Sequence, residues 1–465
     1  MKSICGVRLE ANFVPRIALA LVFILGVNHA AMAADHRVSP QTVKFDCSKV
    51  HAGDTITIPS GARDPLTIQH CTGTASNPIV IRNDPDGDGP TIIRRSAGGS
   101  GGFIFNCLNC VYVEIDGSYK WRGAPLGKTY GIKVTMTGGE GPSAFVRVGG
   151  LSRNFVIRNV EVDGAWPRLK SYGSGIRVND TSIKRSNHPG LWRENVLIED
   201  NYVHNIRNEG MYIGPNYSNG DLPLRNVEVR YNRVEDIGWE GINTKSMWEG
   251  QNSIHHNAIR RAGRNASSKA GQYSAINNIS GAVSIYNNWI DATGQHGILV
   301  WTQDGPKISE NRGPFTTRIW NNVIVNAGSM WKSSIPGGSY GINVGAQDGC
   351  EKPVPYIFNN TIVNSRQAAI NLGSNVAAGL VRDNIAAGSG SNPVIAAPKH
   401  IVLANNQIGA VAQMEFEDPT RQKYRLKNGS PARNQGSKDY PPIDFDDVKR
   451  PRDGAPDQGA FEGNL

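Results

Sequence analysis

The sequence predicts an all-β fold in which short strands recur along the chain and stack into a solenoid. The first observation behind this is that apolar residues never keep a helical period for long, whereas short β-branched runs return again and again. The second is that an asparagine marks the end of each run, at irregular spacings that loops of different length would explain. The third is the content of 53 glycines, which suits a chain with many bends.

Each repeated unit has two recognisable halves. The first half is a β-branched run with an anchoring asparagine: FVIRNVEV (155–162), VLIEDNYV (196–203), VEVRYNRV (227–234), NSIHHNAI (252–259), VSIYNNWI (283–290), TRIWNNVI (317–324), PYIFNNTI (355–362) and GLVRDNIA (379–386). The anchoring asparagines are Asn159, Asn201, Asn232, Asn257, Asn288, Asn322, Asn360 and Asn384. The second half is a strand that begins with Gly-Ile or a variant of it: GIRVND (175–180), GMYIGP (210–215), GINTKS (241–246), SAINNI (274–279), GILVWT (297–302), GINVGA (341–346) and AAINLG (368–373).

A unit of this size cannot bury its own apolar face. Stacked units, each paired with the next at about 4.8 Å, would bury that face together. A ladder of asparagines would satisfy the amide groups at the tight turns of the stack. A β-sandwich is the competing all-β fold, but it would not place every copy in a single phase. The sequence therefore favours a solenoid.

The two ends of the chain differ from the repeats. Residues 1–33 carry Lys2, Arg8 and Arg16 before the apolar run IALALVFILGV and end in Ala-Met-Ala, which predicts a signal peptide and a secreted or periplasmic protein. No other segment is long and apolar enough for a membrane span. We therefore expect residues 34–429 to form the solenoid with an N-terminal cap, and residues 430–465 to close it. We expect a monomer.

Charge and cysteine content narrow the classes of partner and compartment. The formal net charge of +9 favours an anionic partner such as an acidic polysaccharide. No helix-turn-helix, zinc-finger or stacking-sheet motif points to nucleic acid. In an exported protein Cys47–Cys71 and Cys107–Cys110 are the simplest disulfides, and Cys350 has no evident partner. A single Cys-x-x-Cys makes a zinc site the weaker alternative.

The repeats resemble those of single-stranded right-handed parallel β-helix proteins of the pectate-lyase-like superfamily, over nearly the whole chain after residue 33. The segment 53–83, GDTITIPSGARDPLTIQHCTGTASNPIVIRN, is similar to the N-terminal segment of chondroitinase B-like helices. The segment 430–462, SPARNQGSKDYPPIDFDDVKRPRDGAPDQGAFE, resembles the closing segment of many secreted members. Since a solenoid needs polar caps, we expect the acids between Asp444 and Asp457 to serve caps and turns.

The Gly-Ile strands predict one polar face in the middle coils. Alternation places the residue after Ile on the outside: Lys133, Arg177, Tyr212, Asn243, Leu299, Asn343 and Asn371. Two positions further on come Thr135, Asn179, Gly214, Lys245, Asn278, Trp301, Gly345 and Gly373. The position before Gly-Ile holds Glu209, Glu240 and His296, and three residues after the anchoring asparagines lie His204, Glu235, Arg260 and Asp291. Such a face suits an extended anionic sugar chain, with the expected binding residues Arg177, Asn179, Asn243, His204, Trp239, Trp301 and Arg264.

Within this face, EGINTKS (240–246) followed by NSIHHN (252–257) resembles the acid-Ile-x-x-Lys-Ser strand and asparagine repeat of the chondroitinase B and alginate lyase family. The resemblance implies β-elimination on a uronate polysaccharide, with Lys245 as the base and an arginine beside it to bind the carboxylate. It also implies a calcium ion held by carboxylates such as Glu209 and Glu240.

The sequence departs from that family in the following coil. The family's arginine is absent there, where Ala275-Ile276-Asn277-Asn278 stands instead. Arg260, Arg264 or Arg177 would therefore have to take its place. For the remaining proton transfers, Tyr212 is the candidate donor to the leaving oxygen, and His204 and His296 are candidate acids or bases.

Two other functions remain open from the sequence. Glu209 and Glu240 occupy one column of adjacent coils, so their carboxyl groups would approach to about 5 Å, the separation of the acids in a retaining glycoside hydrolase. A non-catalytic polysaccharide-binding β-helix is the third possibility, because the fold by itself does not set the function. The Asp-Pro-His-Asp motif of alginate epimerases is absent from the sequence.

Overall fold

The computed structural model describes residues 33–96, 101–169, 173–215, 220–265, 273–303, 315–333 and 337–463. From Ala33 onward the chain forms one compact unit. The predicted signal peptide lies outside the described residues, apart from Ala33. Among the residues that are described, no helix is long and apolar enough to cross a membrane.

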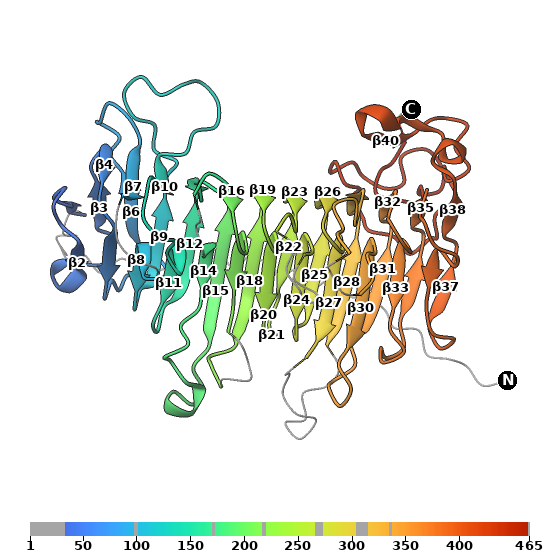
Figure 1. The fold of residues 1–465 in the computed structure, drawn as a ribbon, viewed down its shortest axis with the longest axis horizontal. Coiled ribbons are helices and arrows are strands. Elements are labelled where there is room, and N and C mark those ends of the chain that lie inside the picture. The colour runs from blue at the N-terminus through green and yellow to red at the C-terminus, as the bar shows by residue number, and fades with distance from the viewer. Residues whose placement is uncertain are drawn as a thin grey trace, which may run out of the picture. The chain divides into compact units, whose positions relative to one another are not determined.

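Three long parallel sheets make up the fold, and successive coils add one strand to each (Figure 1). Sheet A contains β1 (Asp35–Arg37), β3 (Thr55–Ile58), β6 (Ile79–Asn83), β9 (Val111–Asp116), β12 (Arg153–Arg158), β15 (Arg193–Glu199), β18 (Leu224–Arg230), β22 (Ser253–His255), β25 (Val283–Tyr286), β28 (Thr316–Trp320), β31 (Val354–Phe358), β34 (Leu380–Arg382) and β37 (Val402–Ala404), with β21 (Met247–Glu249) beside β18.

Sheet B contains the Gly-Ile strands of the repeat. Its members are β2 (Lys44–Asp46), β5 (Leu66–Gln69), β8 (Phe103–Leu108), β11 (Ala144–Gly149), β14 (Ser174–Val178), β17 (Met211–Ile213), β20 (Ile242–Lys245), β24 (Ile276–Ile279), β27 (Ile298–Thr302), β30 (Ile342–Ala346), β33 (Ile370–Leu372) and β36 (Ile395–Ala396).

Sheet C contains the strands that follow the anchoring asparagines. Its members are β4 (Gly61–Arg63), β7 (Thr91–Arg95), β10 (Ile132–Met136), β13 (Val160–Asp163), β16 (Tyr202–Ile206), β19 (Arg233–Ile237), β23 (Ala258–Ala262), β26 (Trp289–Thr293), β29 (Val323–Val325), β32 (Thr361–Val363), β35 (Ile385–Ala387) and β38 (Gln407–Gly409). Within a middle coil the chain passes from sheet A to sheet C and then to sheet B. The predicted all-β parallel β-helix is confirmed.

The asparagine ladder lies at the turn between sheets A and C. In each step the backbone N–H and side-chain amide of one asparagine donate to the Oδ1 of the next, as from Asn288 to Asn322 at 3.1 and 2.9 Å. These side chains are buried, so the ladder satisfies amide groups that would otherwise be unpaired. The ladder begins at Asn201 rather than Asn159, because Val160 stands at the ladder position of its own coil. Asn159 is the positive-φ residue just before it.

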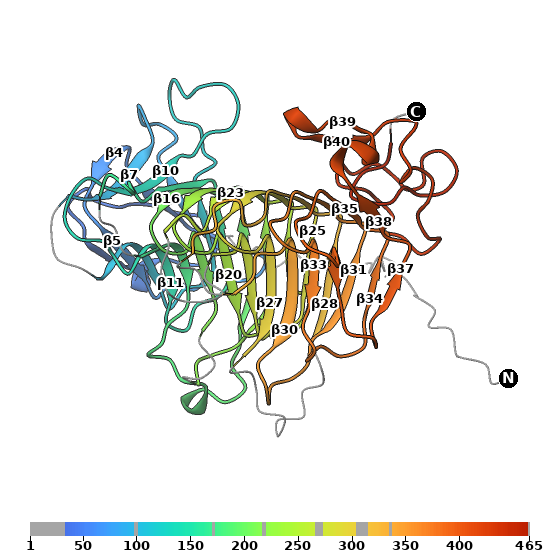
Figure 2. The ribbon, with the colours of Figure 1, turned by 45° about the vertical axis from the view of Figure 1, so that its right-hand side comes forward.

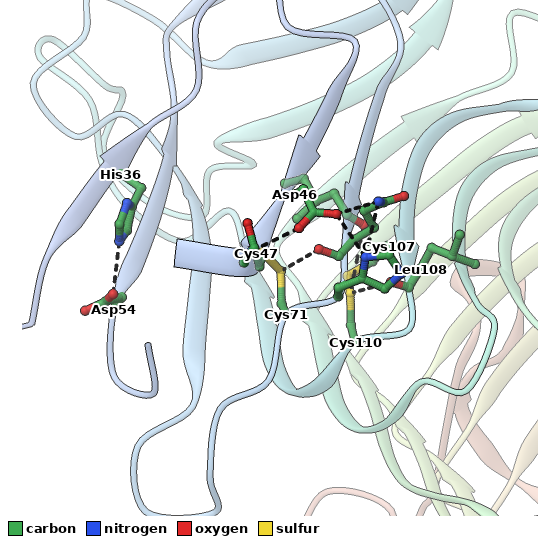
Figure 3. The surroundings of a disulfide bond; sticks show 12 residues. His36, Asp46, Cys47, Asp54, Cys71, Cys107, Leu108 and Cys110 are labelled. Carbon is green, nitrogen blue, oxygen red and sulfur yellow. Dashed lines mark hydrogen bonds and ion pairs between the residues drawn. A yellow bond between two sulfur atoms is a disulfide. The ribbon is translucent and has the colours of Figure 1, made fainter. Parts of the chain in front are cut away.

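The inward-facing residues form one long apolar core. Isoleucine and valine dominate it, and most are fully buried because each is covered by the coils on both sides. The two expected disulfides, Cys47–Cys71 and Cys107–Cys110, are both present in the first coils (Figure 3). Cys350 is outside any disulfide among the described residues.

The C-terminal segment packs against the side of the helix. A hairpin of β39 (Phe416–Asp418) and β40 (Lys423–Leu426) lies near β35 and β38 (Figure 2). Outward apolar residues of sheet C, including Val323 and Val325, are buried against the segment's Phe416 and Phe461. The hairpin, which precedes the predicted closing segment, and that segment from residue 430 thus cover an apolar face of the last coils together.

Acidic residues of the closing segment are structural, as expected. Asp444 accepts backbone N–H bonds from Asp446, Val448 and Glu462. Arg450 and Glu462 form a fully buried ion pair at 2.7 Å. Such groups, satisfied within the segment, fix its path over the coils.

Candidate functional site

Register in sheet B confirms most of the first predicted outward column. Cα pairing aligns Arg177, Tyr212, Asn243, Asn277, Leu299, Asn343 and Asn371 in successive strands. Lys133 does not belong to this column. Its strand, β10, pairs with β7 and β13 in sheet C, and the Lys133 ammonium lies 2.7 Å from Glu161. A Gly-Ile dipeptide therefore does not by itself assign a strand to sheet B.

The second predicted column is also partly correct. Lys245, Ile279, Trp301 and Gly345 are in register, one strand after another. Asn278 was expected here but faces inward, because Ile279 occupies the outward position. The buried Asn278 side chain accepts from Thr244 Oγ1 at 3.0 Å and donates to the Gly281 carbonyl at 2.8 Å. Thr135 lies in β10 and so belongs to sheet C with Lys133.

Three outward side chains from successive coils form a cation–aromatic–cation stack. The Arg177 guanidinium carbon lies 5.3 Å from the Tyr212 ring centroid. The Lys245 ammonium lies 4.9 Å from the same ring. Arg177 is oriented by its Nε, which donates to Asn179 Oδ1 at 2.6 Å. The predicted residues Arg177, Asn179, Tyr212 and Lys245 thus come together on one face of sheet B.

The position before each sheet B strand forms a third column, which contains the two acids. Backbone hydrogen bonds place Ser174, Glu209, Glu240, Ser274 and His296 in successive coils at this position. Glu209 and Glu240 are therefore direct neighbours, as predicted, whereas Ser274 separates Glu240 from His296. Glu209 Oε2 accepts a hydrogen bond from Ser174 Oγ at 2.9 Å.

Glu240 has an unusual environment for a carboxyl group. Its side chain is 2% exposed, and one oxygen accepts from the amides of Asn243 and Asn277, each at 3.3 Å. The other oxygen, Oε2, has no hydrogen-bond partner among the described residues. Burial, followed by the charge of the neighbouring Glu209, raises the pKa of Glu240 to about 8. At neutral pH the carboxyl group is therefore mostly protonated.

A cavity of about 370 Å³ opens directly onto these residues. Glu240 and Lys245 line one part of it, and Trp301 and His296 line another. The Trp301 ring lies flat against the next coil at Gly345, where a Cβ atom would come within 2.5 Å of Trp301 Cζ3. Only glycine leaves room for the ring at that position. The predicted site residues Glu240, Lys245, His296 and Trp301 thus share one cavity.

His296 is neutral in this environment. Burial lowers its pKa to about 3. Nδ1 accepts the backbone N–H of Tyr340 at 3.2 Å, and Nε2 lies 3.4 Å from Asn343 Nδ2. The ring also stacks on Tyr340, with centroids 5.4 Å apart. With its pKa lowered by burial, His296 is a weak base.

Three predicted site residues lie on sheet C or in the turn that follows β23, away from this cavity. His204 is in β16, where it stacks on Tyr202 at 4.1 Å and its Nε2 lies 3.4 Å from Glu161. Arg260 is in β23, in register between Glu235 and Asp291. Arg264 pairs with Asp236.

The reason for this displacement is that strands after the anchoring asparagines form a sheet of their own. Among the candidate arginines, Arg177 alone stands in register with the sheet B residues. Trp239 lies half-buried in the turn that leads from sheet C to Glu240.

Glu209 and Glu240 are the candidate metal ligands of this site. Within the described ranges, no group of three or more His, Cys, Asp or Glu side chains is arranged to hold a metal ion. Glu209 and Glu240 would supply two carboxylates, whereas calcium takes six to eight oxygen ligands. The calcium site implied by the family resemblance stays a prediction.

The sequence contained signals for lining residues that the prediction did not use. Asn277 follows Ile276 just as Tyr212 and Asn243 follow their apolar residues, and it lines the cavity. Tyr340 precedes Gly-Ile in the same way as Glu240, and it lines the cavity as well. Gln303 gave no such signal, because it lies beyond the end of its strand.

Comparison with known proteins adds to this description of the fold. Residues 146–312 match the family model described as "Right handed beta helix region". This match confirms the predicted right-handed parallel β-helix. No curated protein matches the chain.

Solved structures with a similar chain path include carbohydrate-active enzymes. Pectate lyase Pel9A is 12% identical, with 93% of this chain and 97% of that one covered at a TM-score of 0.48. The PL6 family polysaccharide lyase Pedsa3628 from Pseudopedobacter saltans is 13% identical, with 86% and 99% covered at 0.44. The GH136 lacto-N-biosidase from Eubacterium ramulus is 12% identical, with 78% and 63% covered at 0.42.

Proposed function

We propose that this right-handed parallel β-helix is an exported carbohydrate-active enzyme that cleaves a uronate-containing polysaccharide by β-elimination. The observation that carries the proposal is the stack of Arg177, Tyr212 and Lys245 at the edge of the cavity lined by Glu240. It gathers the three groups that β-elimination needs: a cation for the carboxylate, a base for the α-proton and a hydroxyl proton donor for the leaving oxygen.

In this proposal Lys245, in its neutral form, removes the proton from the carbon next to the uronate carboxylate. The electron pair left behind forms a double bond to the neighbouring carbon, whose bond to the glycosidic oxygen breaks. Tyr212 donates its proton to that oxygen as it leaves, and Arg177 binds the substrate carboxylate.

A protonated Glu240 suits an anionic substrate. An ionised carboxylate in the cavity would repel a uronate, whereas a neutral carboxyl group can donate a hydrogen bond from Oε2 to the substrate carboxylate. The amides of Asn243 and Asn277, which hold the other oxygen of Glu240, complete an uncharged polar surface. Trp301 offers a flat apolar surface to a sugar ring.

Glycoside hydrolysis is the second candidate, and one specific observation favours it. Glu240 has a raised pKa and a second carboxyl group, Glu209, in the adjacent coil. A carboxyl group with a raised pKa beside a second carboxyl group is the arrangement that a hydrolase uses for its general acid and its nucleophile. The two candidates differ in whether Glu240 must give up its proton during the reaction.

The test measures two reaction products in the wild-type protein and then compares the activities of two substituted proteins. The protein is incubated with a panel of uronate polymers, and the unsaturated uronate is followed by its ultraviolet absorbance alongside the number of new reducing ends. We expect both signals to rise together. New reducing ends without the absorbance would overturn the lyase proposal in favour of the hydrolase.

The two substitutions test the roles proposed for Lys245 and Glu240. Lys245→Ala is expected to lower kcat by about 10²–10⁴-fold, whereas Glu240→Gln, which keeps a hydrogen-bond donor, should retain activity within about tenfold. The matched control is Lys44→Ala, which removes an exposed lysine from β2, a strand of sheet B in an early coil. A severe loss in Glu240→Gln together with an active Lys245→Ala would contradict the assigned roles.

The proposal also concerns where the protein acts, whether it requires calcium and whether it is a monomer. We infer export through the signal peptide at 1–33, in agreement with the two disulfides, and action as a monomer. A calcium requirement is tested by activity after chelation and after calcium is restored. Sedimentation of the mature protein tests the monomer.

A further inference from the structure

A second cavity lies on sheet A, on a different face from the residues described above. Its volume is about 380 Å³, and it extends over the neighbouring strands β22, β25 and β28 (Figure 1). Ser253 and Ser284 lie in one outward column, with Glu228 before them and Arg318 after them. The small side chains of the two serines, between the longer side chains of Glu228 and Arg318, leave a trough along this column.

One side of the trough is a rigid aromatic wall. Tyr286 and Trp320 line it, and their rings are stacked with centroids 4.3 Å apart and planes 6° from parallel. The stack continues to His255 at 4.5 Å and to Phe358 at 5.8 Å. Because each ring is held by its neighbours, the wall is ordered before any ligand arrives.

The polar groups of the trough are open for a ligand. The hydroxyls of Ser253, Ser284 and Thr316 make no hydrogen bond to another described residue. Arg318 is exposed and forms no ion pair within the described part of the chain, where the ring of Tyr356 lies 5.9 Å from its guanidinium carbon. Glu228, at the negative end of the column, is engaged by its neighbours: its carboxylate pairs with Arg230 at 2.6 Å and lies 3.0 Å from His255 Nε2.

We propose that this trough is a second binding site for a uronate-containing sugar chain. Arg318 pairs with a uronate carboxylate, the serine and threonine hydroxyls bond to sugar hydroxyls, and the edges of Tyr286 and Trp320 pack against the ring. The exposed guanidinium of Arg318, together with the pairing of Glu228 by Arg230, favours an acidic glycan over a neutral one. Binding here requires no bond cleavage, so the inference stands apart from the proposed reaction.

The trough is close to the cavity of sheet B along the chain. Ile279 lines the cavity and Val283 lines the trough, so only Ser280–Ala282 separate them. Four residue steps span at most about 14 Å. A long polymer held in the trough is therefore retained near the cavity, whereas a dimer or trimer in the cavity gains nothing from it.

The test measures glycan binding separately from cleavage. All variants are made in the Lys245→Ala background, and binding to polygalacturonate, alginate and a neutral glucan is measured by affinity electrophoresis. Arg318→Ala is expected to weaken binding to at least one of the uronate polymers by about fivefold, and Ser284→Tyr, which fills the trough, by a similar factor. The control Arg421→Ala removes a guanidinium whose side chain is 78% exposed, and it should leave binding unchanged.

Each outcome decides the inference. Unchanged binding of both trough variants to both uronate polymers would overturn it, as would an equal loss of binding to the neutral glucan. If Ser284→Tyr does not fold, the surface variant Arg318→Ala decides alone. Failure of the wild-type protein to cleave any polymer would refute the proposed reaction and leave the binding result intact.

Discussion

Glu240 provides the most quantitative prediction, because its protonation couples the site to the stability of the fold. Its pKa is 4.5 in an unfolded chain and about 8 in the folded protein. Between these values the folded state holds a proton that the unfolded state has released, so the free energy of unfolding falls as pH rises. At about 1.4 kcal/mol per pH unit, the loss from pH 4.5 to 8 is at most about 5 kcal/mol.

The substitution Glu240→Gln isolates this effect. The variant keeps the shape of the side chain and removes its titration. We expect its free energy of unfolding, relative to the wild type, to increase steadily between about pH 4.5 and 8 and to level off outside that window. His296, whose low folded pKa stabilises the protein as pH rises from about 3 to 6.5, is present in both proteins and cancels in the difference.

The assay is urea unfolding followed by tryptophan fluorescence at several pH values. Glu249→Gln, an exposed glutamate on β21, is the control and should give a flat difference. Parallel pH profiles for the wild type and Glu240→Gln would refute the reasoning, since they would mean that Glu240 is ionised in the folded protein.

Three further predictions concern other parts of the molecule. Tyr212→Phe should lower kcat on a polymer by about 10²-fold or more. A substrate with an activated aryl leaving group should restore the rate, because that leaving group needs no proton. An equal loss of kcat on both substrates would exclude the donor role of Tyr212. Gly345→Ala places a Cβ atom 2.5 Å from Trp301 Cζ3 and should raise KM because it displaces the indole ring. The midpoint of unfolding is the control measurement. An unchanged KM would mean that Trp301 does not contact the sugar. Asn322→Ala leaves buried groups of the asparagine ladder unpaired and should lower the free energy of unfolding by about 2–4 kcal/mol. The control Asn428→Ala, at an exposed position, should leave it unchanged. Equal effects of the two substitutions would contradict the stabilising role of the ladder.

The repeat and its outward columns were predictable because a strand has a strict period of two. Once Ile242 is assigned to the core, Asn243 and Lys245 must face outward, and the structure agrees. The same rule, counted from Ile276 in the core, places Asn277 and Ile279 outside and Asn278 inside, so the expectation for Asn278 was out of step by one residue. The inward side chain of Asn278 is satisfied by Thr244 and Gly281.

The assembly of the site was less accessible from the sequence. Arg260 is close to Lys245 along the chain, yet the chain passes through sheet A between them, so Lys245 lies in sheet B and Arg260 in sheet C. The raised pKa of Glu240 depends on burial by neighbouring coils, which a sequence does not show. The closing segment did leave a signal, since the apolar run Val323–Val325 in β29 indicates a strand covered on both faces.

The mass of the reaction products tests the central claim most directly. A purified uronate oligosaccharide is digested, and each cut gives two fragments. The fragment from the leaving-group side is set aside, and the mass of the fragment with the new non-reducing end is measured. Elimination predicts that this end is lighter by one water than a hydrolysis product, and that the lighter species disappears in Lys245→Ala and persists in Lys44→Ala. Fragments of full hydrolytic mass, unaffected by Lys245→Ala and abolished by Glu240→Gln, would contradict the account.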